Sequence, residues 1–368
     1  MTPRKDVMHE AMRLMQTGDL QAATRTLQHA LGGVAGQASP HPAGSGTGDA
    51  AANGPCIEGE FRVIDDGEAS PAEAPSRASG AGDVSDARRR FSCDAGELEY
   101  RLHIPEGLDT PGAPLLVMLH GCTQTPEDFA RGTRMNLLAD EHGYVVAWPA
   151  QSVRRNQNRC WNWFRSSDQQ RGKGEPAILA ALTRQLVATH RLDAGRVYVA
   201  GLSAGGAMAA VLASTYPDVY AAIGVHSGLP TGLASDMPSA FAAMRKGGGS
   251  GRRTSATGTR SVPAIVFHGD SDATVHPDNG HSVIEQSLAS GGGLDAAARS
   301  TTVERDIASG GRSFTRTVHR NADAGIAAEH WVIHGAGHAW AGGDTAGTYA
   351  DPQGPDASAQ MLRFFAAL

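Results

Sequence analysis

The chain has 368 residues, of which 40% are hydrophobic, and a formal net charge of −6. This length allows one large core with additional segments, and the weakly acidic balance gives no support to nucleic-acid binding, which would need a concentrated basic face. The longest apolar runs, such as Leu115–Leu119, are far too short to cross a bilayer, so we expect no membrane span.

The first 88 residues predict two segments that precede the main domain. Residues 1–31 carry apolar side chains at helical spacing with a break at Gly18-Asp19, which predicts a short N-terminal helical segment. Such helices must dock to bury their apolar stripe, either as a cap on the main domain or as a docking element for a partner. Residues 32–88, rich in Gly, Ala, Ser, Pro and Asp, are expected to form a low-complexity, flexible linker.

Residues 89–368 are expected to form one domain in which strands alternate with helices. A hairpin strand is predicted at 98–104, and buried strands at 115–119, 145–148, 197–200, 222–225, 264–267 and 331–333. Helical patterns separate them at 126–142, 176–190, 205–216, 279–290 and 357–368. The alternation predicts an α/β fold, a three-layer sandwich around a mainly parallel sheet. A mobile surface insertion is expected at 246–260, and the Gly- and Ala-rich stretch 290–300 looks similar.

A strand, a tight turn and a helix are predicted around Ser203. The apolar strand runs into Gly201-Leu202-Ser203-Ala204-Gly205, and a helical pattern follows at once. A serine at such a turn takes a strained backbone conformation that lifts its hydroxyl clear of the sheet, and the flanking glycines avoid clashes with the neighbouring strand and helix. We therefore expect Ser203 to be a catalytic nucleophile and the N–H of Ala204 to donate to an oxyanion.

A serine nucleophile needs a base and an acid that orients the base, and both follow Ser203 in the chain. Asp272, followed closely by a valine, is favoured as the acid over Asp270, which is expected to hold its loop through backbone hydrogen bonds. His338, between a glycine and an aromatic residue, is favoured as the base over His334, which ends a strand. No CxxC pair and no metal-binding helix pattern is present, so no metal or cofactor is expected.

Two further loops are expected to complete the site. The loop after strand 115–119 is the expected position of a second oxyanion donor, and Cys122 N–H is the favoured one. Dense aromatic residues between this loop and Ser203 form either local core or a substrate-binding wall. We assign Trp161 and Trp340 to the wall and Phe164 to the core.

Together these motifs resemble the esterase family of poly(3-hydroxybutyrate) depolymerases, a family of the α/β-hydrolase fold that also contains feruloyl and acetylxylan esterases. The resemblance covers roughly residues 91–368. It is carried by Leu119-His120-Gly121-Cys122-Thr123-Gln124, Cys160-Trp161-Asn162-Trp163, Gly201-Leu202-Ser203-Ala204-Gly205-Gly206, His268-Gly269-x-x-Asp272-x-x-Val275 and Gly337-His338-Ala339-Trp340.

The resemblance implies a serine esterase with the triad Ser203, Asp272 and His338, acting on a polyester or oligomer of 3-hydroxyalkanoates. It also implies a disulfide between Cys122 and Cys160 and an extracellular or periplasmic location. No apolar stretch follows the first basic residues, so a secretory signal is not visible and a cytoplasmic, reduced form is the alternative.

Two other functions stay open at the level of sequence. The first is a feruloyl, acetylxylan or general short-chain carboxylesterase, because an indole stacks on a phenolic ring as readily as it borders a polyester. The second belongs to another class: a non-catalytic binding module in which the N-terminal helices recruit a partner. The sequence does not indicate an oligomeric state.

Overall fold

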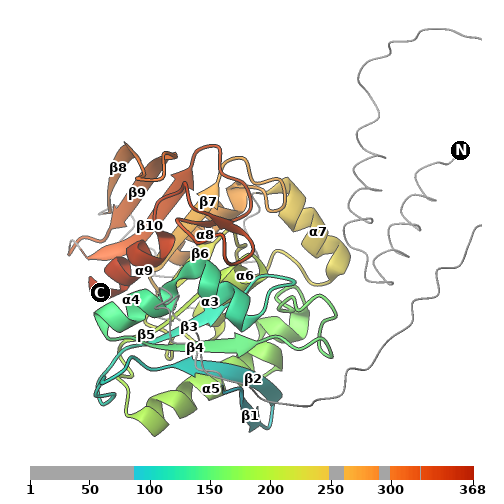
Figure 1. Cartoon of the computed structure of the whole chain (residues 1–368). Helices are drawn as coiled ribbons and strands as arrows, with labels where there is room; N and C mark the ends of the chain where they lie inside the picture. Colours follow the sequence, from blue (N-terminus) through green and yellow to red (C-terminus); the bar gives the residue numbers. More distant parts are fainter. Residues whose placement is uncertain (1–86, 248–260, 290–298, 324) are drawn as a thin grey trace, which may run out of the picture. The chain divides into compact units, whose positions relative to one another are not determined.

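The computed structural model describes residues 87–247, 261–289, 299–323 and 325–368 (Figure 1). The predicted N-terminal helical segment lies outside these residues, as does almost all of the predicted linker 32–88 and of the insertion 246–260. Of the Gly- and Ala-rich stretch 290–300, only the last two residues are described.

One large sheet organises the described part of the chain. Its strands are β1 (Arg89–Cys93), β2 (Gly96–His103), β3 (Leu115–Leu119), β4 (Val145–Ala150), β5 (Val197–Leu202), β6 (Ala222–His226), β7 (Ala264–Gly269), β8 (Ser300–Ile307), β9 (Ser313–Arg320) and β10 (Ile326–Ile333). They lie in the order β1-β2-β4-β3-β5-β6-β7-β10-β9-β8. A pair of short strands, β11 (Trp340–Ala341) and β12 (Ala350–Asp351), lies outside this sheet.

The six central strands of the sheet, from β4 to β10, are parallel, whereas the pairs at both edges are antiparallel. Strands β3, β5, β6 and β7 are buried along their whole length, as continuous apolar sequences require in the middle of a parallel sheet. The carboxyl ends of parallel strands meet at one edge. Here the register pairs Leu202 with His226 and Gly269 with Ile333, so the loops that follow these strands start side by side.

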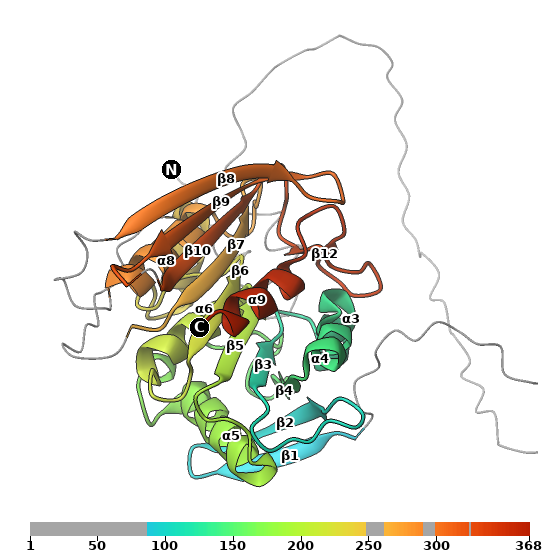
Figure 2. The same ribbon diagram turned by 90° about the vertical axis from the view of Figure 1, so that its left-hand side faces the viewer.

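Helices cover both faces of the sheet. They are α3 (Pro126–Thr133), α4 (Met135–His142), α5 (Gly174–His190), α6 (Ala204–Thr215), α7 (Met237–Lys246), α8 (Asp278–Ala289) and α9 (Ala357–Ala366), with a 3-10 turn at Ser166–Gln169. Helices α3, α4 and α9 pack with one face of the sheet in one apolar cluster, and α5, α6 and α8 pack with the other face in a second cluster. Figure 2 shows α3, α4 and α9 on the side of the sheet opposite α8. The predicted three-layer α/β sandwich with a mainly parallel sheet is therefore confirmed.

The prediction of one helix over 126–142 is wrong. The chain breaks at Arg134, whose φ of 52° is left-handed, so that it ends α3 and precedes α4. Its guanidinium donates to Gly342 O at 3.0 Å and to Asp356 Oδ2 at 3.2 Å. These partners come from the C-terminal part of the chain, and the break lets both short helices follow the curved surface of the sheet.

Sequence reasoning also missed several peripheral elements. Strand β1 forms the predicted hairpin with β2, but β8 and β9 carry polar side chains on both faces and gave no strand pattern. Helix α7 was not predicted, and its last residue, Lys246, is where the surface insertion was expected to begin. Within the described residues, no helix is both long and apolar enough for a membrane span.

Candidate active site

Ser203 lies at the turn between β5 and α6, in a conformation that a side chain rarely adopts. Its φ is 56° and its ψ is −116°, a positive φ that places it among the strained backbone positions typical of functional sites. Two backbone hydrogen bonds hold the turn: Ser203 N donates to His226 O at 2.8 Å, and Ala207 N donates to Ser203 O at 2.9 Å. The neighbouring strand and the following helix therefore fix this residue in its strained state.

The two glycines beside Ser203 allow the helix to approach the sheet. A Cβ on Gly201 would lie 2.7 Å from Leu119 O, and one on Gly205 would collide with Leu119 O and lie 2.8 Å from His120 O. Backbone atoms at these distances cannot move aside cheaply. The start of α6 is therefore packed directly against the end of β3 and the loop that follows it.

Asp272 and His338 meet at the same edge of the sheet. His338 Nδ1 donates to Asp272 Oδ2 at 2.7 Å, and Asp272 Oδ1 accepts from Thr274 N and Val275 N, both at 2.9 Å. Burial of the Asp272 carboxyl opposes its ionisation. The hydrogen bonds from His268 and His338, the His338 charge and the bond from Val275 N outweigh it and lower the pKa of Asp272. The result is a fixed carboxylate that orients the His338 imidazole, whose Nε2 has no hydrogen-bond partner among the described residues.

The less favoured candidates for the acid and the base, Asp270 and His334, contact each other. His334 Nδ1 lies 2.8 Å from Asp270 Oδ2, and His334 Nε2 lies 2.9 Å from Thr315 Oγ1. Asp270 Oδ1 also accepts from Gly335 N at 2.7 Å. Asp270 thus binds the backbone of the loop that begins at His334, and both ring nitrogens of His334 already have partners.

The loop after β3 presents one backbone N–H without a partner in the described structure. Gly121 N donates to Gln124 Oε1 at 2.9 Å, and Thr123 N donates to Asn158 O at 2.7 Å. The Cys122 N–H between them has no such bond among the described residues. Ala204 N, at the first position of α6, has no partner within the helix. The structure therefore shows no acceptor, among the described residues, for either N–H predicted as an oxyanion donor.

His120 braces this loop from inside the protein. Its side chain is buried, its Nδ1 lies 2.8 Å from Gly121 O, and its Nε2 accepts from Gln151 N at 3.2 Å. Burial lowers the pKa of His120 to about 4, so the ring is neutral at pH 7 with the proton on Nδ1. Trp161 Nε1 donates to His120 O at 3.1 Å. A neutral imidazole and an indole thus hold the residues before Cys122.

The predicted disulfide between Cys122 and Cys160 is confirmed. The two Cα atoms are 4.2 Å apart, and the bond joins residues separated by 38 positions. Glu175 lies beneath it, buried at the start of α5, and accepts from Asn162 N at 2.7 Å and from Gln151 Nε2 at 2.5 Å. Burial raises the pKa of Glu175. This carboxyl therefore binds both ends of the loop that carries Cys160, between β4 and α5.

The two tryptophans assigned to a substrate wall are packing groups in the structure. Trp161 and Trp340 are each 1% exposed, and Trp340 Nε1 donates to Ser358 Oγ at 3.0 Å. The Trp340 ring stacks on His226 and meets Phe129 edge to face. Both indoles therefore support loops of the site from below and offer almost no surface to a substrate. Phe164, assigned to the core, is 6% exposed.

His226 connects the turn of Ser203 with the loop of His338. Its backbone oxygen accepts from Ser203 N, and its buried Nε2 accepts from Ala341 N at 3.0 Å. Burial and the neighbouring His268 and His338 keep the pKa of His226 well below its usual value. Sequence reasoning missed His226, and also Gln151 and Glu175, because each acts through distant partners and lies in no motif of its own.

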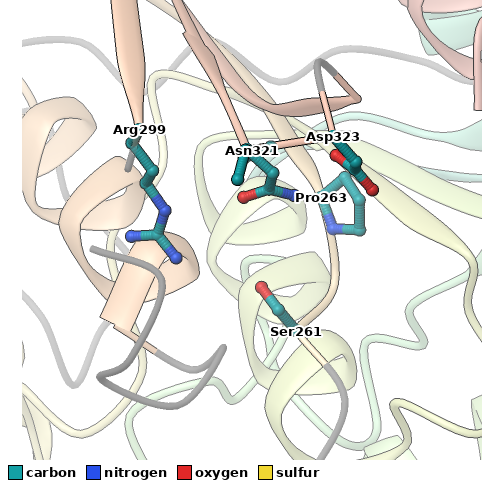
Figure 3. A pocket seen from close by; sticks show the side chains of 7 residues that line it. Ser261, Pro263, Arg299, Asn321 and Asp323 are labelled. Carbon is teal, nitrogen blue, oxygen red and sulfur yellow. The ribbon is translucent and has the colours of Figure 1, made fainter. Parts of the chain in front are cut away.

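The cavity of about 390 Å³ shown in Figure 3 lies elsewhere. Its walls come from residues just before β7 and β8, including Pro263 and Arg299, from the turn between β9 and β10, including Asn321, and from the start of β10. These positions lie at the opposite ends of the strands from the loops of Ser203 and His338. Among the described residues, no group of three or more His, Cys, Asp or Glu side chains is arranged to hold a metal ion.

Comparison with known proteins identifies relatives of the chain. A sequence profile described as "Esterase PHB depolymerase" matches residues 98–308. Poly(3-hydroxyalkanoate) depolymerase C of Paucimonas lemoignei is 34% identical over 257 residues, which are 67% of this chain and 60% of that protein. Feruloyl esterase B of Thermothelomyces thermophilus is 27% identical over 211 residues, which are 53% of this chain and 71% of that protein.

Among solved structures, the acetyl xylan esterase from Aspergillus awamori superposes with a TM-score of 0.57 at 19% sequence identity. The superposition covers 77% of this chain and 100% of that one. At this identity the likeness concerns the fold, and it confirms the predicted α/β-hydrolase architecture.

Proposed function

Because the chain belongs to the esterase family of PHB depolymerases, we propose that it hydrolyses carboxylic esters through Ser203, His338 and Asp272. The observation that carries this proposal is the Asp272–His338 hydrogen bond of 2.7 Å, formed beside the strained turn of Ser203. His226 ties the two loops together. These contacts support the proposal, because acyl transfer by a serine needs a base held by an acid close to the nucleophile.

In the first step the Ser203 hydroxyl attacks the ester carbonyl carbon while His338 Nε2 takes the hydroxyl proton. Asp272 holds the ring and stabilises the imidazolium that forms. The carbonyl oxygen becomes an anion, which the N–H groups of Cys122 and Ala204 bind. The intermediate then collapses: its C–O bond to the alcohol breaks while His338 gives the proton to the departing oxygen, and the alcohol leaves behind an acyl-Ser203 ester.

In the second step water attacks the acyl-enzyme with His338 again as base. The same two N–H groups bind the second anion; the bond between the acyl carbon and Ser203 Oγ then breaks, His338 returns the proton to Ser203 Oγ, and the carboxylic acid leaves. Hydrolysis of p-nitrophenyl butyrate by the wild type and by Ser203→Ala tests both steps. We expect the variant to lose at least about 10³-fold in rate, as triad variants do; an equally active variant would sink the proposal.

For the ester we propose poly- or oligo(3-hydroxyalkanoates), with feruloyl, acetylxylan or short-chain carboxylic esters as the second candidate. The 34% identical relative supports the first and the 27% identical one the second. The chain spans 60% of the first relative's length, so the comparison concerns that part of it. Rates on 3-hydroxybutyrate oligomers and on methyl ferulate, measured side by side, decide between them.

We also propose an oxidising location, extracellular or periplasmic. Its support is the disulfide Cys122–Cys160, since such bonds persist outside reducing compartments.

The domain boundaries proposed from the sequence are 1–31, 32–88 and 89–368. A chain shortened to residues 80–368 is expected to keep the esterase rate of the full chain. Loss of that rate would show that the catalytic domain needs the first 79 residues for its activity.

A further inference from the structure

With both tryptophans buried, another aromatic side chain borders the candidate site. Tyr349 is 46% exposed, and its ring lies edge-to-face with that of His338 at a centroid distance of 6.3 Å. Its hydroxyl is 3.5 Å from Thr123 Oγ1, in the residue after Cys122. Tyr349 therefore reaches from the base to the oxyanion loop while keeping almost half of its surface free.

The backbone holds Tyr349 in this place. Its φ is 53°, a left-handed conformation that is uncommon for an aromatic residue. On one side Thr348 is bound by Asp128 through its N–H at 3.0 Å and by Gln124, whose Nε2 donates to Thr348 O at 3.0 Å. On the other side Tyr349 O accepts from Trp340 N at 2.6 Å. An exposed ring on a backbone fixed in a strained state is typical of a functional position.

The chemistry indicates which part of an ester this ring would meet. His338 delivers its proton to the oxygen of the leaving alcohol, so the alcohol part lies on the His338 side of the reacting carbonyl. The ring beside His338 is that of Tyr349. We propose that Tyr349 contacts the alcohol part of the ester and determines which alcohols are accepted, an inference that rests on the esterase function proposed above.

Two butyrate esters separate this role from a structural one. Methyl butyrate and benzyl butyrate form the same butyryl-Ser203, so their deacylation is identical and any difference arises from the alcohol. Tyr349→Asn removes the ring with a residue that tolerates left-handed backbone. We expect it to lower kcat/KM for benzyl butyrate about five- to tenfold, the effect of one lost aromatic contact, and to change the value for methyl butyrate less than twofold.

Two further variants serve as controls. Tyr349→Phe keeps the ring and should stay within about twofold of the wild type on both esters, which also guards against misfolding of the asparagine variant. Val303→Ala removes an exposed apolar side chain of β8, at the far edge of the sheet, and should change neither rate.

If Tyr349→Asn lowers kcat/KM for both esters by the same factor, or changes neither value, the assignment is overturned while the esterase function stands. A wild type that hydrolyses neither ester and whose Ser203 resists a fluorophosphonate would overturn the esterase function and the assignment together. A benzyl-specific loss in Tyr349→Asn that Tyr349→Phe does not show supports the assignment.

Discussion

The buried imidazole of His120 makes the stability of the folded protein depend on pH, independently of any proton transfer to the substrate. Its pKa is lowered by burial from 6.5 to about 4. Between these values the unfolded chain binds a proton that the folded chain does not, so stability is complete above pH 6.5 and falls as the pH drops towards 4. At pH 5 this single group should cost about 2 kcal/mol of unfolding free energy relative to pH 7.

Urea unfolding at pH 7 and pH 5 measures this change in the free energy of unfolding. His120→Gln offers an amide in place of the imidazole and does not titrate in this range. The loss of unfolding free energy between pH 7 and pH 5 should be about 2 kcal/mol smaller in the variant than in the wild type. The other histidines titrate equally in both proteins and cancel in this difference, so the same loss in both would exclude His120 as the source.

Single residues were predicted from the sequence where a motif fixes their backbone. Ser203 and Cys122 follow buried strands at tight turns, and the turn dictates where the residue lies. Trp161 and Trp340 follow no such rule, because an indole in a loop can point outward or inward. Their direction depends on partners in other elements, such as His120 O for Trp161 and Ser358 in α9 for Trp340. Tyr349 has neither a strand nor a glycine pair before it to mark it.

At the scale of elements, the disulfide joins the loop after β3 to the loop that precedes α5. It closes a loop of about 39 residues, which corresponds to about 4 kcal/mol of stabilisation by the chain-entropy argument. Cys160→Ala leaves the Cys122 backbone N–H in place but frees its loop. We expect thermal unfolding at a lower temperature and a lower esterase rate, because one oxyanion donor is no longer held in position.

Reduction of the wild-type protein should reproduce the effect of Cys160→Ala on both unfolding temperature and rate. Cys93, a free thiol, provides the control: Cys93→Ser should respond to reductant as the wild type does. A reduced protein with unchanged rate and unchanged unfolding temperature would show that Gln151 and Glu175 hold the loop unaided.

The strands in the middle of the sheet were predicted because both of their faces are buried. Strands such as β3, buried on both faces, have continuous apolar sequences that no exposed segment shows. Strand β8 is exposed throughout and reads as a polar loop, because only its hydrogen bonds to β9 make it a strand. The break at Arg134 was invisible for a different reason: its partners Gly342 and Asp356 come from the other end of the chain.

At the scale of the whole molecule, a buried carboxylate joins the second half of the sheet to the C-terminal helix. Glu329 in β10 is fully buried and binds Arg316 Nη2 of β9 at 2.9 Å and Arg363 Nη2 of α9 at 2.5 Å. Burial opposes its ionisation, but the two arginines lower the pKa of Glu329. Its contribution to stability is therefore complete at pH 7 and is lost as the pH falls below about 4.5.

Glu329→Gln should lower the unfolding free energy at pH 7 by about 3 kcal/mol, the lower end for a broken buried pair, because both arginines keep part of their hydration. Asp218→Asn is the matched control. Asp218 pairs with Arg171 and Arg184 where all three side chains are about half exposed, so its loss should be at most about 1 kcal/mol. Equal losses in urea unfolding would contradict the role assigned to Glu329.

The α/β architecture could be predicted from the alternation of strands and helices. Short right-handed crossovers between parallel strands leave only a few possible topologies. The proposal that Ser203 acts with Asp272 and His338 rests on the same topology, since each lies after the carboxyl end of a parallel strand. The contacts that hold them there, such as those of His226 and Glu175, depend on packing across the sheet and could not be read from any local pattern.

The central claim is that Ser203 is activated by His338 and Asp272. Intact-mass analysis after reaction with a fluorophosphonate tests it most directly, because only an activated serine reacts with such a probe at an appreciable rate. We expect one adduct per chain in the wild type, located on Ser203, and none in Ser203→Ala or His338→Ala. A wild type left unmodified, or an adduct that persists in Ser203→Ala, would contradict the account.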